Sequence, residues 1–207
     1  MRSLLHSPAR PLGPTRRRVL VAVAGLAVLV GTGVRPAAAQ GAAVAYAVDA
    51  RASSITYDMR HPTHGWTGTS RSVTGSLLVR ADGAIVGGMV TAPVASFDSG
   101  NRNRDSNMLE VTGAATYRAV TFQAVRVTPL AVPTADVTAT VEGVLTFHGV
   151  RQAVRVPVKV EAVPGGVRLQ GRLAVTLTQF RIDAPRLLGV RVDDRIGLAL
   201  DLVARRP

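Results

Sequence analysis

Residues 152–162, QAVRVPVKVEA, decide the fold class, because apolar and polar side chains alternate along them without a break. Val154, Val156, Val158 and Val160 share one phase, and the other phase carries most of the charge of this stretch. Successive side chains of a β-strand point to opposite faces. The pattern therefore predicts a half-buried antiparallel strand.

The same alternation continues on both sides of this stretch. It recurs in residues 54–59, 73–80, 119–127, 137–147, 167–177 and 196–202. Turn signals separate the runs: Ala81-Asp82-Gly83, His148-Gly149 and Pro164-Gly165-Gly166. Residues 85–97 are apolar in both phases, which predicts a strand covered on both faces.

Two stretches interrupt the pattern. Residues 99–113 predict one short helix, capped by asparagine or serine and stopped at Gly113. Residues 179–192 predict a long connection. About eight strands and one helix predict an all-β fold, a closed or nearly closed antiparallel barrel, because closure leaves no exposed sheet edge. A β-sandwich is the alternative.

Residues 1–39 are predicted to be a cleaved export signal. Their first part holds arginines and no acid, residues 19–34 are an apolar run, and Ala37, Ala38 and Ala39 precede Gln40. The motif TRRRVL at 15–20 has the twin-arginine form. The alternatives are an ordinary Sec signal and an uncleaved anchor. Residues 40–207 then form a single domain, in the periplasm or secreted.

The composition excludes several classes of site. Six of the 25 basic residues and none of the 13 acidic ones lie in residues 1–39, so the net charge falls from +12 to +6 after cleavage. That charge is spread along the chain, unlike the basic patch of a nucleic-acid-binding protein. The absence of cysteine excludes disulfides, Fe–S clusters and cysteine nucleophiles.

The inward phase is mainly Val, Ala, Leu and Gly, with few aromatic residues. An eight-stranded barrel can be filled by its own side chains or can hold one small ligand. Small inward residues are compatible with a cavity, and a solid core of Val and Leu is the alternative.

Several motifs, in order, resemble the YceI-like family, whose members are exported, lipocalin-like, polyisoprenoid-binding proteins. The motifs are YAVD at 46–49, SSITY at 53–57, VTGSL at 73–77, SGN at 99–101 with Arg104-Asp105 and Met108-Leu109, YRAVTF at 117–122, GVLTFHGV at 143–150 and the tail 180–202. Many members lack the histidine pair of HPTHGW at 61–66.

This resemblance implies an extended eight-stranded antiparallel barrel, lipocalin-like, with one short helix. Its pore would hold a lipid with an isoprenoid or fatty-acyl tail, and no other cofactor. The function expected is that of a periplasmic carrier or sequestering protein for a long-chain amphipathic lipid, with transient membrane contact. Members often dimerise, so a homodimer is also implied, and a structural or stress-response dimer with an incidental cavity is a further alternative.

Ten residues are candidates for contact with the ligand, because they continue the inward phase or lie near a barrel end. They are Tyr57, Met59, His61, Trp66, Arg104, Met108, Phe122, Phe147, Val158 and Leu173. Ordinary core packing is the alternative for the apolar ones. Arg104 would lie near an anionic or carbonyl headgroup. Its alternative role is to pin the helix to the strands together with Asp105, by backbone hydrogen bonds and an ion pair.

The histidines carry a second hypothesis, a metal- or haem-binding protein. His61 is predicted to point into the barrel end, and His64, beyond Pro62, is placed in a loop. A metal site needs three or four ligands, so His61, His64 and His148 would have to meet. Hydrogen bonds to loop carbonyls are the alternative. No nucleophile elbow, His-Glu-x-x-His motif or phosphate loop is present, so no enzyme is expected.

Overall fold

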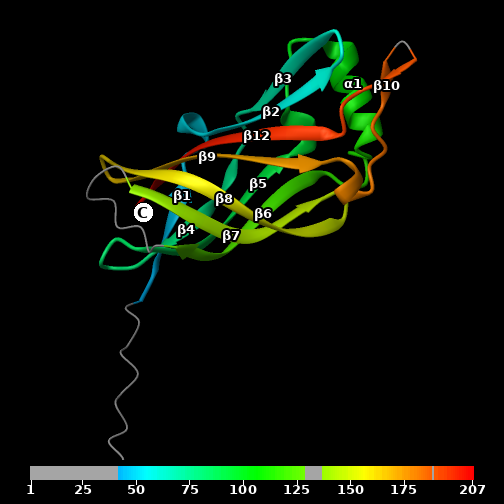
Figure 1. The fold of residues 1–207 in the computed structure, drawn as a ribbon. Helices are drawn as coiled ribbons and strands as arrows, with labels where there is room; N and C mark the ends of the chain where they lie inside the picture. Colours follow the sequence, from blue (N-terminus) through cyan, green and yellow to red (C-terminus); the bar gives the residue numbers. More distant parts are fainter. Residues whose placement is uncertain (1–41, 129–136, 188) are drawn as a thin grey trace, which may run out of the picture. The chain divides into compact units, whose positions relative to one another are not determined.

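Antiparallel strands dominate the computed structural model, which describes residues 42–128, 137–187 and 189–207 (Figure 1). The strands are β1 (Val44–Val48), β2 (Ser54–His61), β3 (His64–Ser70), β4 (Thr74–Val79), β5 (Ile85–Pro93), β6 (Ala119–Thr128), β7 (Val137–Phe147), β8 (Val150–Val163), β9 (Gly166–Thr176), β10 (Arg186–Leu187), β11 (Val190–Arg191) and β12 (Arg195–Arg205). The helices are α1 (Arg102–Val111) and the 3-10 turns η1 (Ala50–Ala52), η2 (Val94–Ser96) and η3 (Thr178–Phe180).

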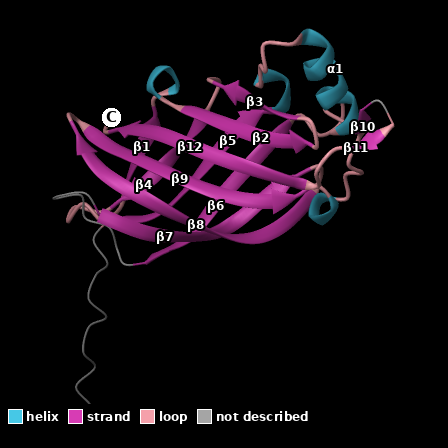
Figure 2. Cartoon of the chain, turned by 45° about the horizontal axis from the view of Figure 1, so that its top comes forward, coloured by secondary structure: helices cyan, strands magenta, loops and turns pink. Residues whose placement is uncertain are grey.

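The main sheet closes on itself (Figure 2). Hydrogen-bonded neighbours follow the order β1-β4-β5-β6-β7-β8-β9-β12, and β12 also pairs with β1. The structure therefore confirms the predicted eight-stranded antiparallel barrel. It adds the β2–β3 hairpin, which extends the sheet from β12, and a small β10–β11 hairpin within the long connection.

β1 and β2 are two parts of one interrupted strand along β12. Ala47 and Val48 pair with the last residues of β12, and residues 54–58 pair with Gly197–Asp201. Ser53 lies at the interruption, where its hydroxyl accepts the backbone N–H of Val203 at 3.0 Å. The hydroxyl thus satisfies a buried donor that the interrupted ladder would leave unpaired.

The barrel wall is less complete beside β3. This strand pairs with β2 along its length, but its other edge is joined to the following chain by one isolated bridge among the described residues, Thr69 to Asp98. The helix α1 lies at this end of the barrel, next to the β10–β11 hairpin (Figures 1 and 2). We call this the helix end, and the opposite end, where β1 pairs with β4, the closed end.

The helix α1 confirms the prediction for residues 99–113. The side chain of Asn101 accepts the backbone N–H of Arg104 at 3.1 Å, and Gly113 follows the helix with a φ of 57°. A left-handed backbone of this kind favours glycine. No α1 residue is buried, and no helix in the described part of the chain is long and apolar enough to cross a bilayer.

The predicted alternation is confirmed along the barrel strands. Val156, Val158 and Val160 of β8 are buried, and the residues between them are exposed. The core has an aliphatic half and an aromatic half. The first contains only Val, Leu, Ile and Ala among its buried residues, and the second includes Tyr57, Phe97 and Phe180.

The prediction that residues 85–97 form a strand covered on both faces is wrong. Met89 on the outer face is 52% exposed, and β5 ends at Pro93, where the turn η2 begins. The second phase reads as apolar because Gly87 and Gly88 carry no side chain and because the register of β5 shifts against β4.

Candidate functional site: an apolar cavity within the barrel

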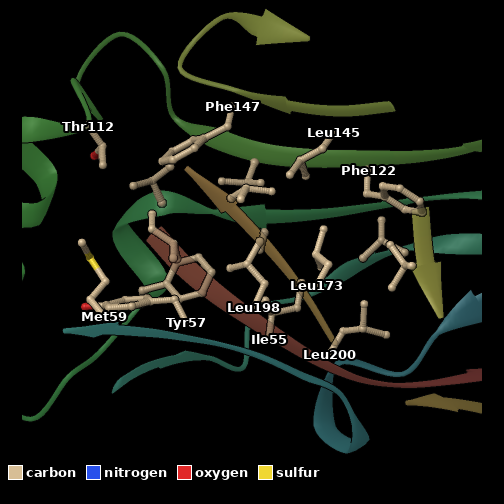
Figure 3. Close-up of a pocket in the computed structure, with 18 of the residues that line it drawn as sticks. Ile55, Tyr57, Met59, Thr112, Phe122, Leu145, Phe147, Leu173, Leu198 and Leu200 are labelled. Carbon is tan, nitrogen blue, oxygen red and sulfur yellow. The ribbon is translucent and has the colours of Figure 1, made fainter. Parts of the chain in front are cut away.

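The barrel encloses a cavity of about 490 Å3 (Figure 3). Side chains from opposite walls point into one space. They include Ile55, Tyr57, Leu198 and Leu200 on one side and Phe122, Leu145 and Phe147 on the other. Among the described residues, no aspartate or glutamate lines the cavity. The walls are therefore suited to a long apolar group.

Small inward residues leave the barrel axis open. Gly87, Gly88, Ala92 and Ala124 line the cavity, and side chains of this size do not meet across an eight-stranded barrel. The structure thus favours the cavity over the alternative of a core filled by Val and Leu.

Two aromatic rings lie along the wall rather than across the axis. A Cβ atom added to Gly68 would lie 2.4 Å from Cε1 of Tyr57, the residue opposite it in β2. A Cβ atom on Gly143 would lie 2.5 Å from Cζ of Phe122. Each ring occupies the space that a side chain at the glycine would need. These two glycines therefore let large rings cover the wall without filling the cavity.

The helix end of the cavity carries the polar lining. His64, Trp66 and Arg186 line it together with the face of α1. That face is formed by Arg104, Asn107, Met108 and Val111, which are three or four residues apart and so share one side of the helix. The guanidinium carbon of Arg104 lies 5.3 Å from the centre of the Trp66 ring, within the range of a cation–π contact.

Tyr57 has a buried hydroxyl at this end. The residue is 8% exposed, and its hydroxyl makes no hydrogen bond within the described part of the chain. Burial raises the pKa of Tyr57, and the Asp105 carboxylate raises it further, whereas Arg104 opposes the rise. The phenol is therefore neutral near pH 7.

Nine of the ten predicted ligand residues line the cavity: Tyr57, Met59, Trp66, Arg104, Met108, Phe122, Phe147, Val158 and Leu173. The exception is His61, which is buried at 9% exposure but is not among the lining residues. His64 lines the cavity instead. Whether the nine residues bind a ligand stays a prediction.

The prediction that His64 lies in a loop is wrong. The hairpin turn contains only Pro62 and Thr63, so His64 already belongs to β3 and pairs with His61. Pro62 does end β2, as expected from its missing N–H.

Thr63 connects the two imidazoles. Its hydroxyl lies 2.8 Å from Nδ1 of His61 and 2.9 Å from Nδ1 of His64, and its backbone N–H donates to Nδ1 of His61 at 3.4 Å. One hydroxyl has one hydrogen, so it donates to a single ring. The neutral arrangement that fits has His61 accepting at Nδ1 and His64 donating from Nδ1. The Nε2 atom of His61 is buried without a partner in the described chain.

His148 lies apart from this pair. Its Nδ1 is 3.0 Å from the carbonyl oxygen of Phe180, and its ring packs against Tyr117 with centroids 4.4 Å apart. In residues 42–128, 137–187 and 189–207, no three or more His, Cys, Asp or Glu side chains are grouped as metal ligands would be. The three histidines of the metal hypothesis therefore do not meet.

Arg104 and Asp105 divide the roles that the sequence left open. The Asp105 carboxylate accepts the backbone N–H of Ser99 at 3.2 Å, so Asp105 does pin the helix. Arg104 forms no ion pair with Asp105 or with any other residue described, and its side chain turns to Trp66 and the cavity.

Some lining residues were not singled out from the sequence, among them Phe97, Asn107, Val111 and Arg186. The helical spacing from Arg104 to Asn107 and Val111 is a signal that could have found two of them. Phe97 packs against Tyr57 with ring centres 5.8 Å apart. It lies beyond the end of its strand, where alternation no longer indicates direction. Arg186 carries no pattern at all.

The fold and the cavity define a class of protein, the lipocalin-like barrel with an internal apolar site. The YceI-like domain matches residues 46–204, and the chain therefore belongs to the YceI-like family. No curated protein matches the chain.

Three solved structures share the fold. BcnA from Burkholderia cenocepacia is 22% identical, with a TM-score of 0.65, and the match covers 76% of this chain and 99% of BcnA. A polyisoprenoid binding domain from Saccharophagus degradans, implicated in plant cell wall breakdown, is 18% identical with a TM-score of 0.65 over 79% and 99% of the two chains. The YCEI protein of Campylobacter jejuni is 15% identical with a TM-score of 0.57 over 68% and 84%.

Proposed function

We propose that the protein binds a long-chain amphipathic lipid, of polyisoprenoid or fatty-acyl type, with the tail inside the barrel. The observation that carries this proposal is the enclosed cavity, about 490 Å3 in volume, whose lining is apolar except at one end. Ligand pockets in proteins have volumes of about 300–1,000 Å3. The similarity to a solved polyisoprenoid binding domain supports the same class of ligand.

The energetics of such a ligand fit the cavity. Apolar surface gains about 25 cal/mol for each Å2 removed from water, so a tail that buries a few hundred Å2 gains several kcal/mol before the cost of ordering it. The walls supply this gain without any reacting group. We therefore propose a binding protein and not an enzyme.

The cellular role that we propose is carriage or sequestration of the lipid in the periplasm. It rests on the export signal expected in residues 1–39, which lie outside the described residues. Loading and delivery would require transient contact with a membrane. A dimer is not needed for a cavity that one chain encloses.

The test is to identify what occupies the barrel. We expect native mass spectrometry and solvent extraction of purified residues 40–207 to yield a long-chain lipid bound to the folded protein. A titration of the delipidated protein with a long-chain polyprenol and with hexadecanoic acid would measure binding directly. A protein that carries no lipid and binds neither compound would end the proposal.

A matched pair of variants separates the cavity from the outer wall. Ala124 lines the cavity, and its neighbour Val125 is 66% exposed on the outside of β6. Ala124→Trp is expected to reduce lipid binding by about tenfold or more, because the indole occupies space needed by the tail. Val125→Trp is expected to bind as the natural protein does. Circular dichroism melts would show that both variants are folded.

A further inference from the structure

The helix end of the cavity has charge of one sign. Arg104 of α1 and Arg186 of β10 line it, and no carboxylate does. The nearby Asp105 does not line the cavity, and its oxygens accept the N–H of Ser99. The Asp105 carboxylate is near enough to raise the pKa of Tyr57, but among the described residues the groups that line this end are guanidinium groups, amides and an imidazole.

Arg104 is the better placed of the two arginines. It is half-buried, its backbone N–H is taken by Asn101, and its guanidinium stacks on Trp66 while forming no ion pair with any described residue. A guanidinium stacked on a ring keeps the N–H donors at its edge available. Arg186 is exposed, and its Nη1 donates to the carbonyl of Gly189 at 3.2 Å.

Trp66 fixes the direction of that guanidinium. It belongs to β3 opposite Met59 of β2, and the ring of His64 packs 5.7 Å from it. The indole is thus held by the β2–β3 hairpin, while Arg104 comes from α1. Trp66 is therefore a positioning residue for Arg104.

The neighbouring amides cannot select a headgroup by charge. Asn101, Asn103 and Asn107 line the same end, and an amide offers both a donor and an acceptor. A guanidinium only donates, and it binds carboxylate and phosphate oxygens through two parallel hydrogen bonds. Discrimination between headgroups therefore falls to the arginine.

We infer that the cavity selects amphiphiles with an anionic oxygen headgroup, a carboxylate or a phosphate, and that Arg104, oriented by Trp66, makes the selection. This inference rests on the proposed lipid-binding function and specifies the ligand class for the same site. A cationic headgroup is disfavoured at this end, and a neutral alcohol lacks the negative charge that the guanidinium recognises.

Four probes with the same tail test the inference: hexadecanoic acid, hexadecyl phosphate, hexadecanol and hexadecylamine. Calorimetric titration of the delipidated protein at neutral pH and low salt should show the two anions binding about tenfold more tightly than hexadecanol. Hexadecylamine should bind most weakly. The tighter of the two anions identifies the headgroup, and either order supports the inference.

Variants assign the preference to a residue. Arg104→Gln should remove the preference, so that this variant binds the two anions no more tightly than it binds hexadecanol. Arg102→Gln is the matched control, since Arg102 is exposed on the same helix and does not line the cavity. Trp66→Leu should weaken the preference for anions, and Trp66→Tyr should restore it, because a ring again supports the guanidinium.

The outcomes distinguish a failure of this inference from a failure of the proposed lipid-binding function. Equal binding of hexadecanol and hexadecanoic acid would show a lipid site without headgroup selection and would overturn the inference alone. Retention of the anion preference in Arg104→Gln would also overturn it. Failure of all four probes to bind would remove the proposed function and the inference together.

Discussion

The two ends of the barrel are built from different parts of the chain. At the closed end, β1 pairs with both β4 and β12, so backbone hydrogen bonds run around the barrel. At the helix end, β3 is joined to the following chain by the Thr69–Asp98 bridge, and α1 lies over the cavity with no buried residue of its own. At the closed end the wall is a continuous ladder of paired strands, and at the helix end side chains of α1 and β3 line the cavity.

The lining differs in the same way. The buried residues of the aliphatic half are Val, Leu, Ile and Ala, whereas the helix end has most of the aromatic rings, the amides and the arginines. Apolar burial is non-directional, so it can hold a tail but cannot orient it. The polar end supplies the direction. In the function that we propose, one end of the barrel would thus supply the affinity for the tail and the other the recognition of the headgroup.

The largest difference expected between the two ends is in hydrogen exchange. Amides of β8, which pairs with β7 and β9, should exchange only on global unfolding, and those of α1 should exchange by local opening. We expect rates in α1 to be higher by about 1,000-fold or more. Mass spectrometry of exchanged peptides measures this. Equal protection of β8 and α1 would contradict the expected difference between the two ends.

The next effect is on stability. Leu169→Ala at the closed end removes a residue that is 5% exposed and should lower the free energy of unfolding by about 3 kcal/mol. Met108→Ala on α1 should lower it by less than about 1 kcal/mol, since Met108 is only partly buried. Urea titrations of both variants give the values, and a Met108→Ala cost equal to that of Leu169→Ala would refute the expected difference.

A smaller effect is expected where an aromatic ring covers a glycine. Gly68→Ala would place a methyl group 2.4 Å from the Tyr57 ring, so the ring must move, at a cost of about 2 kcal/mol. The displaced ring enters the cavity and should weaken lipid binding. Gly87→Ala is the control for stability, because its methyl group would meet Leu78 at an ordinary 3.6 Å. Thermal melts of the two variants compare their stabilities, and a lipid titration of Gly68→Ala against the natural protein measures the effect on binding.

The smallest effect concerns pH. A hydrogen bond from Arg168 lowers the pKa of Asp201 below its ordinary value of 3.8. A lowered pKa in the folded state means that this pair stabilises the protein above the unfolded pKa and loses its contribution as the pH falls through the folded value.

Asp201→Asn should therefore flatten the acid side of the stability curve by less than about 1 kcal/mol, because the pair is partly exposed. Urea titrations between about pH 5 and pH 2 measure the change. Arg168→Gln should flatten the curve in the same way, and an unaltered slope in both variants would contradict the assignment.

The candidate site was partly readable from the sequence. The two-residue alternation of the strands and the position of the short helix indicated which side chains face inward. Nine of the ten residues chosen in this way line the cavity. His64 was misplaced because the turn at Pro62-Thr63 is shorter than the proline suggested. The phase of β5 was misread because glycines and a register shift hide it.

The sequence by itself determined the short capped helix and most of the strands with their apolar phase, although not β1 or β3, because these features follow from local periodicity and capping chemistry. Only the tertiary structure decided that Tyr57 lies over Gly68, that Phe122 lies over Gly143 and that Arg104 stacks on Trp66. These contacts join different elements, and the register between strands and the docking of α1 set them. The cavity too was decided by the tertiary structure, because its size depends on the distance between the walls and not on any one strand.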